Sequence, residues 1–237
     1  MFAGTKASLA RLISAVERES PDLPEVMEMI NPLLGKAYCI GITGPPGGGK
    51  STMVDKLAAV IRSKGLSVGV VAVDPSSPIS GGAILGDRIR MQQHYLDDGV
   101  FIRSMATRGS HGGLSKAVRA TVNLLDAFGL DIVMVETVGV GQTETSIMEI
   151  ADTIVLVLVP ESGDAIQFMK AGLIEVADII VVNKADHEGA ERLVAELKDT
   201  LIFNGKQAKQ SIMVTQAVND IGIEELYQEL DKRHRFC

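Results

Sequence analysis

GITGPPGGGKST, residues Gly41 to Thr52, packs five glycines and two prolines into twelve residues. Within it, Gly44 to Ser51 satisfies G-x4-G-K-[ST], the pattern of a phosphate-binding loop. Backbone amides without side chains can turn inward toward phosphates, where a side chain would block the approach. The apolar run before the loop predicts a strand, and the helix expected from Ser51 adds its positive N-terminal end.

The loop also predicts individual roles. Lys50 is expected to reach the outer phosphates and to act in catalysis, and the Ser51 hydroxyl is expected to ligate Mg²⁺. The residues expected to hold the phosphates are Gly44, Pro45, Gly47, Gly48, Gly49, Lys50, Ser51 and Thr52. The alternative is a glycine-rich turn that binds nothing, but the full pattern between a strand and a helix favours the phosphate loop.

Outward from the loop, short apolar runs alternate with helical patterns, which predicts a mostly parallel sheet with helices on both faces, an α/β fold. The expected strands lie in residues 37–43, 66–74, 99–105, 131–137, 152–160, 178–183 and 211–215. The expected helices are Ser51–Lys64, Ile84–Tyr95, Leu114–Phe128, Ala165–Val176, Glu188–Phe203 and Ile223–His234.

Composition narrows the class of protein. The chain has 237 residues, is 46% hydrophobic and carries a net charge of −7, so a sizeable core is expected and a nucleic-acid partner is not. The longest apolar run, Ile154 to Val159, is far shorter than a membrane span, and no leader opens the sequence. We therefore expect a cytoplasmic protein without a membrane partner. Cys39 lies in an apolar strand and is expected in the core.

A second motif follows a later strand. Asn183-Lys184-Ala185-Asp186 has the N-K-x-D form that selects guanine. The Asp186 carboxylate can accept hydrogen bonds from the ring N–H and the exocyclic amine of guanine, and adenine offers no matching donors. Lys184 would lie along the base and Asn183 would brace the loop. Thr215 and Ala217, after the last strand, are a weaker match to the remaining base-contacting loop.

These motifs divide the chain into two parts. Residues 1–36 carry a helical stripe of Leu9, Leu12, Ile13 and Val16 followed by prolines, which predicts a helical N-terminal appendage. Residues 37–237 form the expected P-loop GTPase domain.

Three carboxylates are candidates for the Mg²⁺ site, because this ion keeps much of its water shell. Asp74 and Glu136 end expected strands, and Asp87 lies in a glycine-interrupted segment that could order around the γ-phosphate. Asp87 and Glu136 are also candidate catalytic residues. Glu136 could instead be a solvated or capping acid.

The segment after Glu136 is a candidate switch. Gly139 and Gln142 belong to a loop that is expected to change shape on loss of the γ-phosphate. Val140 stands where Ras-like proteins carry the glutamine that orients the attacking water, so slow intrinsic hydrolysis is expected.

Six motifs in order closely resemble the MeaB/ArgK group of P-loop GTPases, over about residues 8 to 233. They are GITGPPGGGKST, VDPSSPISGGAILGDRIRM, RSMATRGSHGGLS, ETVGVGQTE, PESGDAIQFMKAG and VVNKADHEGA. The resemblance implies the SIMIBI type of P-loop NTPase fold. It also implies a GTP-hydrolysing chaperone that gates adenosylcobalamin delivery to, and protects, a cobalamin-dependent acyl-CoA mutase such as methylmalonyl-CoA mutase.

By the same resemblance Lys50, Ser51, Asp74, Asp87 and Glu136 serve phosphate and Mg²⁺, and Gln167 and Lys170 belong to a third switch. Two departures stand out. Members of the group carry a further C-terminal helical arm used for dimerisation, whereas this sequence stops at Cys237, which leaves the oligomeric state open. Phe168 and Met169 also differ from the smaller residues common in the third switch.

Two other classes of protein are alternatives. A P-loop kinase, as in the older label of an arginine/ornithine (LAO/AO) transport kinase, is the main one, but it needs a base and a second substrate pocket that no motif demands. A nickel-handling GTPase needs clustered Cys and His ligands, and the sequence shows no such cluster.

Overall fold

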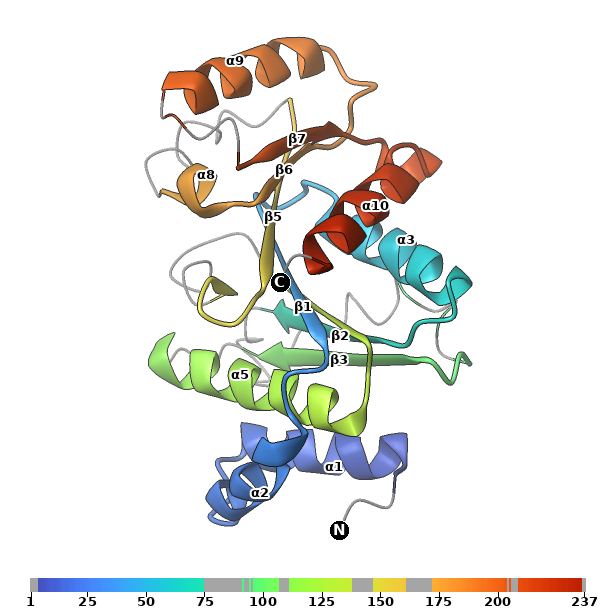
Figure 1. Ribbon diagram of the computed structural model, residues 1–237, viewed down its shortest axis with the longest axis vertical. Coiled ribbons are helices and arrows are strands. Elements are labelled where there is room, and N and C mark those ends of the chain that lie inside the picture. Colours follow the sequence, from blue (N-terminus) through green and yellow to red (C-terminus); the bar gives the residue numbers. More distant parts are fainter. Residues whose placement is uncertain are drawn as a thin grey trace, which may run out of the picture.

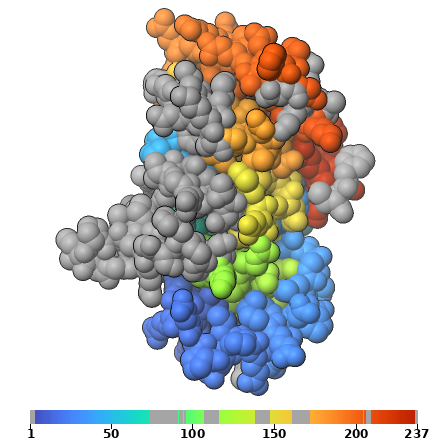
Figure 2. All heavy atoms as spheres, turned by 90° about the vertical axis from the view of Figure 1, so that its left-hand side faces the viewer, coloured from blue at the N-terminus to red at the C-terminus, as the bar shows by residue number. Residues whose placement is uncertain are grey.

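The computed structural model describes residues 4–74, 91, 94, 96–106, 111–137, 147–160, 172–203, 205 and 209–235, with residues 74 and 111–115 described by backbone alone. These residues form an elongated molecule built on one sheet, with the N-terminal helices at one end and helix α9 (Ala190–Phe203) at the other (Figure 1). The same two ends are the blue and orange regions of the molecular surface in Figure 2.

All seven strands of the sheet run parallel, in the order β3-β2-β4-β1-β5-β6-β7. Their bounds are β1 Tyr38–Thr43, β2 Val68–Asp74, β3 Val100–Ala106, β4 Ile132–Glu136, β5 Thr153–Leu158, β6 Ile179–Val182 and β7 Ser211–Val214. Every predicted strand is present, and the predicted α/β class is confirmed. Parallel strands end at the same edge, so their C-terminal residues meet there.

Helices cover both faces of the sheet, because alternate strand residues point to opposite faces. Ile40 and Ile42 pack with α3 (Lys50–Ser63) and α10 (Ile223–His234), which lie together on the right in Figure 1. Cys39 points the other way. The elements on that second face are α1 (Lys6–Glu17), α2 (Leu23–Ile30), the 3-10 turn η1 (Asn31–Leu33), α5 (His111–Phe128), α8 (Leu173–Val176) and α9.

The helix predictions agree best where the apolar period is unbroken. The predicted helix Ile223–His234 coincides with α10, and α3 begins one residue before the predicted Ser51. Helix α5 begins at His111 rather than Leu114, since two glycines in its first turn weaken the local helical signal. Most of Ile84–Tyr95 and the first part of Ala165–Val176 lie outside the described residues.

The N-terminal helices bury the predicted apolar stripe. Leu9, Ile13 and Val16 of α1 and Ile30 of α2 are buried in the same cluster as apolar residues of α5, β2 and β4. The two helices therefore share a core with the sheet, and the division of the chain at residue 36 stays a prediction.

Asp126 of α5 fixes the chain between these helices and β1. Its buried carboxylate accepts hydrogen bonds from the backbone N–H groups of Gly35, Lys36 and Ala37, at 2.6, 3.1 and 2.9 Å. The three bonds are partly buried, and hydrogen bonds to a charged acceptor are stronger than those between neutral groups, so this carboxylate holds the start of the first strand in place.

We predict that Asp126→Ala lowers the free energy of unfolding by about 1–3 kcal/mol, because three partly buried hydrogen bonds to a charged acceptor are lost. Urea denaturation measures the change. Asp98→Ala is the matched control, since the Asp98 side chain is fully exposed and lies 4.0 Å from Lys6 in a surface pair. Equal stability of the two variants would show that Asp126 does not anchor this segment.

Two further expectations concern the core and the membrane. Cys39 is buried as predicted, and burial together with the nearby Asp152 and Asp126 carboxylates raises the pKa of its thiol to about 12. This thiol is therefore protonated and unreactive at neutral pH. Among the described residues, no helix is long and apolar enough to cross a membrane.

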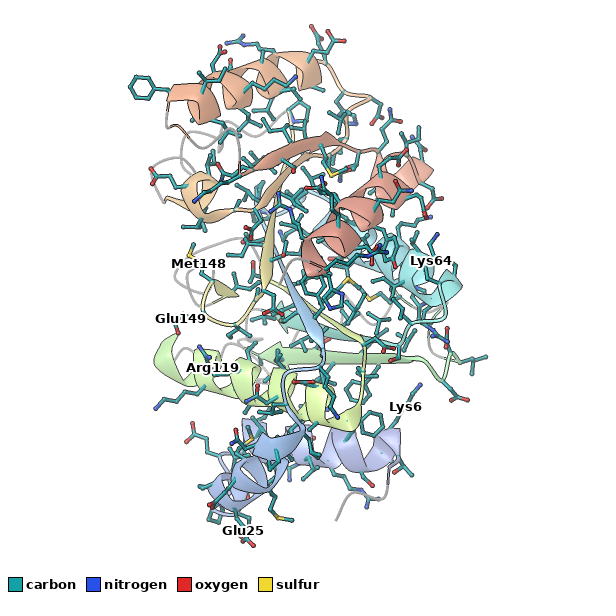
Figure 3. All side chains as sticks on the ribbon, viewed as in Figure 1. Lys6, Glu25, Lys64, Arg119, Met148 and Glu149 are labelled. Atoms are coloured by element: carbon teal, nitrogen blue, oxygen red, sulfur yellow. The ribbon has the colours of Figure 1, made fainter. Side chains whose placement is uncertain are left out.

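An ion pair supports the turn that precedes β5. Arg119 of α5 donates to the backbone carbonyl of Glu149 at 2.9 Å and lies 3.5 Å from its carboxylate (Figure 3). Ile147, in the same turn, is buried against β1, where a Cβ on Gly41 would lie 2.8 Å from its side chain. The turn is thus held from both sides as the chain enters the central part of the sheet.

Candidate functional site

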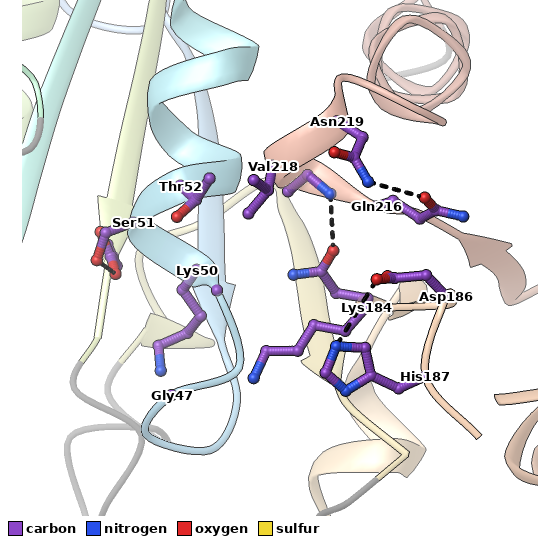
Figure 4. A pocket seen from close by; sticks show the side chains of 14 residues that line it. Gly47, Lys50, Ser51, Thr52, Lys184, Asp186, His187, Gln216, Val218 and Asn219 are labelled. Carbon is purple, nitrogen blue, oxygen red and sulfur yellow. Dashed lines mark hydrogen bonds and ion pairs between the residues drawn. The ribbon is translucent and has the colours of Figure 1, made fainter. Parts of the chain in front are cut away.

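A cavity of about 560 Å³ lies at the C-terminal edge of the sheet, between the phosphate loop and the loops that follow β6 and β7 (Figure 4). Lys50 and Ser51 face it from one side, and Lys184 and Asp186 face it from the other. Its lining consists of Gly47, Gly49, Lys50, Ser51, Thr52, Glu136, Asn183, Lys184, Asp186, His187, Gln216, Ala217, Val218 and Asn219. The volume and the polar walls suit a nucleotide-sized ligand.

Two glycines let the phosphate loop pack against its neighbours. Gly44 and Gly49 have φ values of 139° and 85°, in the region that favours glycine. A Cβ on Gly44 would lie 2.0 Å from the Val157 carbonyl oxygen, and one on Gly49 would lie 2.4 Å from Nδ2 of Asn183. Larger residues at these positions would push the loop away from β5 and from the opposite wall of the cavity.

Lys50 lies within the curl of the loop. Its Nζ donates to the carbonyl oxygens of Gly44 and Pro45, both at 2.8 Å, and the residue is 5% exposed. A phosphate is a stronger acceptor for an ammonium group than a carbonyl oxygen is. The lysine is therefore already held at the place where phosphate would compete for it.

Ser51 and Glu136 form a buried oxygen pair beside the loop. The Ser51 hydroxyl donates to Oε1 of Glu136 at 2.6 Å. At the next position, Thr137 donates from its hydroxyl to Thr43 at 3.0 Å and from its backbone N–H to Ile42, which joins the ends of β4 and β1. The acid is thus fixed in position by the sheet itself.

This donor set fits Mg²⁺, which binds through oxygen and takes most of its ligands from water and phosphate. The described residues contain no group of three or more His, Cys, Asp or Glu side chains that could hold a metal alone. The serine hydroxyl and one carboxylate therefore suit an ion that arrives with a nucleotide better than a resident metal.

Asn183 connects the two walls of the cavity. Its Nδ2 donates to the Gly48 carbonyl oxygen at 2.9 Å. Its Oδ1 accepts from the Thr215 hydroxyl at 3.0 Å and from the Ala217 N–H at 3.1 Å. One buried side chain therefore sets the spacing between the phosphate loop and the loop after β7.

The residues after Asn183 face the cavity from a strained turn. Lys184 has a φ of 55°, in the left-handed region, and its carbonyl oxygen accepts from the His187 N–H at 3.0 Å. The Asp186 carboxylate lies 3.7 Å from Nε2 of His187 at the mouth of the cavity. The backbone of this turn is tied to the β7 loop by a bond from the Ala185 N–H to the Thr215 carbonyl oxygen. A carboxylate and a lysine stem are thus presented side by side.

Comparison with known proteins agrees with this geometry. The sequence pattern of the family described as "Methylmalonyl Co-A mutase-associated GTPase MeaB" matches residues 9–237. The chain belongs to the MeaB family. It is a P-loop GTPase that binds guanine nucleotide.

Named relatives extend the comparison. A protein of Pyrococcus abyssi named as a GTPase is 52% identical over 99% of this chain and 74% of its own length. GTPase ArgK of Escherichia coli is 35% identical, covering 96% and 72% of the two chains. The mouse protein named methylmalonic aciduria type A homolog, mitochondrial, is 37% identical over 94% of this chain and 53% of its own length.

Solved structures show the same fold. A structure titled LAO/AO transport system kinase has a TM-score of 0.78 and 28% identity, covering 98% of this chain and 72% of its own. The nickel-bound HypB of Helicobacter pylori has a TM-score of 0.64 at 18% identity, over 90% of this chain and 94% of its own, which is a likeness of fold alone.

The structure of this MeaB-family GTPase brings most of the predicted site residues to one cavity. Gly44, Pro45 and Gly48 form the backbone behind its lining and accept from Lys50 or Asn183. Thr215 is fully buried and bonds Asn183 rather than lining the cavity. Ala217, by contrast, lines it directly.

Of the remaining predicted site residues, the structure describes one by its backbone alone and does not describe the others. Asp74 ends β2, whose Ala72 is in register with Glu136, so its backbone lies at the same edge of the sheet. The other predicted residues lie outside the described part of the chain, namely Asp87, Gly139, Gln142, Gln167 and Lys170.

Four residues of the lining were not predicted as site residues: His187, Gln216, Val218 and Asn219. Three of them sit in the tight turn after β7, which is closed by a bridge between Gln216 and Ile221 and includes the 3-10 turn η3 (Ala217–Asn219). The local signal for two of the four residues was the neighbouring motifs, since Gln216 stands between Thr215 and Ala217 and His187 follows Asp186 directly.

We predict that Asn183→Ala weakens GTP and GDP binding by roughly tenfold and lowers the free energy of unfolding by about 1–3 kcal/mol, because buried partners on both walls lose their bonds. Nucleotide titration and urea denaturation measure the two effects. Asn31→Ala is the matched control, since Asn31 is exposed and does not line the cavity. Similar results for both variants would remove Asn183 from its bridging role.

Proposed function

We propose that this GTPase is a nucleotide-switched chaperone that gates adenosylcobalamin delivery to, and protects, a cobalamin-dependent acyl-CoA mutase such as methylmalonyl-CoA mutase. The observation that carries the proposal is the family match over residues 9–237, in a family described by its association with that mutase. The mouse relative, named for methylmalonic aciduria, supports it.

In this proposal the two walls of the cavity divide the recognition of GTP. The loop amides and the N-terminus of α3 hold the phosphates, and Lys50 leaves the carbonyl oxygens of its own loop for phosphate oxygens. Asp186 reads the two donors of guanine, and the Lys184 stem lies along the base. Thr215 acts through Asn183 and Ala217 contributes its backbone.

Ser51 and Glu136 would hold Mg²⁺, with Asp74 and Asp87 as further proposed carboxylates. The ion, when bound, would offset negative charge on the phosphates. The proposed switch residues are Gly139, Gln142, Gln167 and Lys170. Gly139 and Gln142 follow Glu136 by a few residues, and Gln167 and Lys170 follow β5, so both segments leave from the edge of the sheet that carries the cavity. A change at the γ-phosphate could therefore be relayed to a client through them.

Phosphoryl transfer to a transport protein is not favoured. The solved relative titled as a transport system kinase shares the fold at 28% identity. The relatives from Pyrococcus abyssi and Escherichia coli, both more similar in sequence, are named as GTPases.

We predict that Asp186→Asn weakens GTP binding and shifts preference to xanthosine triphosphate. Xanthine presents an oxygen where guanine has its amine, and the asparagine amide can donate to that oxygen. Competition between the two nucleotides for the purified protein measures the shift. The control is Asp199→Asn, on the exposed surface of α9. An unchanged guanine preference would contradict the role of Asp186.

The chaperone proposal is tested by single-turnover GTP hydrolysis with and without a cobalamin-dependent methylmalonyl-CoA mutase. We expect the mutase to accelerate hydrolysis by the wild type. We expect Lys170→Ala to bind GTP within about threefold of wild type, a change below about 0.7 kcal/mol, yet to lose most of the acceleration.

Lys198→Ala, on the exposed face of α9, is the control for that experiment. No acceleration of the wild type would argue against this client. Full acceleration of the Lys170 variant would show that Lys170 does not couple GTP hydrolysis to the mutase.

A further inference from the structure

A second cavity lies between α1 and β3. Strand β3 is the edge strand at the opposite end of the sheet from β6 and β7, whose following loops line the nucleotide cavity. Its volume is about 600 Å³, close to that of the nucleotide cavity. Its lining residues are Ala10, Arg11, Ser14, Ala15, Arg18, Ser20, Pro21 and Arg103. We call this the arginine groove. Its lining contains three arginines and no carboxylate, in a chain whose net charge is −7.

The floor of the arginine groove is fixed by Arg103 of β3. The Arg103 guanidinium donates to the Ser14 hydroxyl at 3.0 Å and pairs with the Glu17 carboxylate. Ser14 in turn donates to the Ala10 carbonyl oxygen at 3.0 Å. The side chains of Arg103 and Glu17 are only 17% and 18% exposed, so this pair is largely shielded from solvent. The pair connects α1 to β3. The Glu17 carboxylate balances the charge of Arg103, so the positive charge of the groove comes from its other two arginines.

Arg11 and Arg18 form the charged wall. Both are exposed, and among the described residues neither makes an ion pair or a side-chain hydrogen bond. Arg11 lies in the middle of α1 and Arg18 is its C-cap residue, seven positions later, which places their backbone positions on the same face, about 10 Å apart along the helix axis. Arginines are fully charged and suit carboxylates by paired N–H donors.

We propose that the arginine groove binds an acidic segment of a partner protein, with carboxylates that meet Arg11 and Arg18. The spacing favours a segment over a small anion, because the backbone positions of the two arginines lie about 10 Å apart along the helix axis, and a segment can offer each arginine its own carboxylate. In a polyproline II chain, which has three residues per turn and rises about 3.1 Å per residue, acidic residues at every third position share one face and lie about 9 Å apart. This assignment does not depend on the partner's being a mutase.

The direct test uses a short blocked peptide with glutamates at every third position, and the same peptide with glutamines. We expect the wild-type protein to bind the glutamate peptide and not the glutamine peptide, with affinity that falls as salt is raised. In the double variant Arg11→Gln/Arg18→Gln the dissociation constant should rise roughly fivefold or more, since two exposed pairs are removed.

The matched control is Arg192→Gln/Lys198→Gln, which removes the same charge from the exposed face of α9. It should bind the glutamate peptide within about twofold of wild type. All variants should keep wild-type GTP hydrolysis, because none of these residues lines the nucleotide cavity. Failure of the mutase to accelerate hydrolysis would leave this peptide result unaffected, so the two proposals fail separately.

Several outcomes would overturn the proposal. Equal loss of binding in the two double variants would indicate a general charge effect, and equal binding of the two peptides would exclude carboxylate recognition. Absence of peptide binding together with Arg11- and Arg18-dependent binding of inorganic phosphate would make the groove a small-anion site. The same dependence seen with anionic phospholipid vesicles, but not with the peptide, would make it a membrane contact.

Discussion

The nucleotide cavity depends on the buried side chain of Asn183. A primary amide can donate and accept at once, and here it donates to Gly48 on one wall and accepts from Thr215 and Ala217 on the other. An aspartate would lack the donor, and an apolar residue would leave buried groups on both walls without partners. The bond to Gly48 also needs Gly49 beside it, because any side chain there would strike the amide. The width of the cavity is therefore set by the protein and not by its ligand.

The parallel sheet supplies the second constraint. Because β4 pairs directly with β1, the acid that ends β4 stands within a hydrogen bond of the serine that follows the phosphate loop. Strand β5 pairs with β1 on its other side, so β4 and β5 both end beside the strand that leads into the phosphate loop.

The two cavities divide the molecule. The nucleotide cavity lies over the middle of the sheet and its β6 and β7 side, whereas the arginine groove lies at the β3 edge under α1. Helices α1 and α2 pack on α5. Asp126 of α5 in turn accepts hydrogen bonds from the segment that leads into β1. A physical connection therefore runs from the groove to the strand that precedes the phosphate loop, through a packed helix and a set of partly buried hydrogen bonds.

The sequence alone determined the fold class, the seven strands and both nucleotide motifs, because these follow from local patterns: apolar runs, glycines before a lysine, and an acid three positions after an asparagine. It could not separate Thr215, which is buried behind the wall, from Ala217, which lines it. It also did not select His187, Gln216, Val218 and Asn219 as lining residues. Nor did it indicate the arginine groove, where Arg103 joins Arg11 and Arg18 from a strand far along the chain. Only the tertiary structure decided these points, since contact between distant segments depends on strand order and packing, which no local pattern encodes.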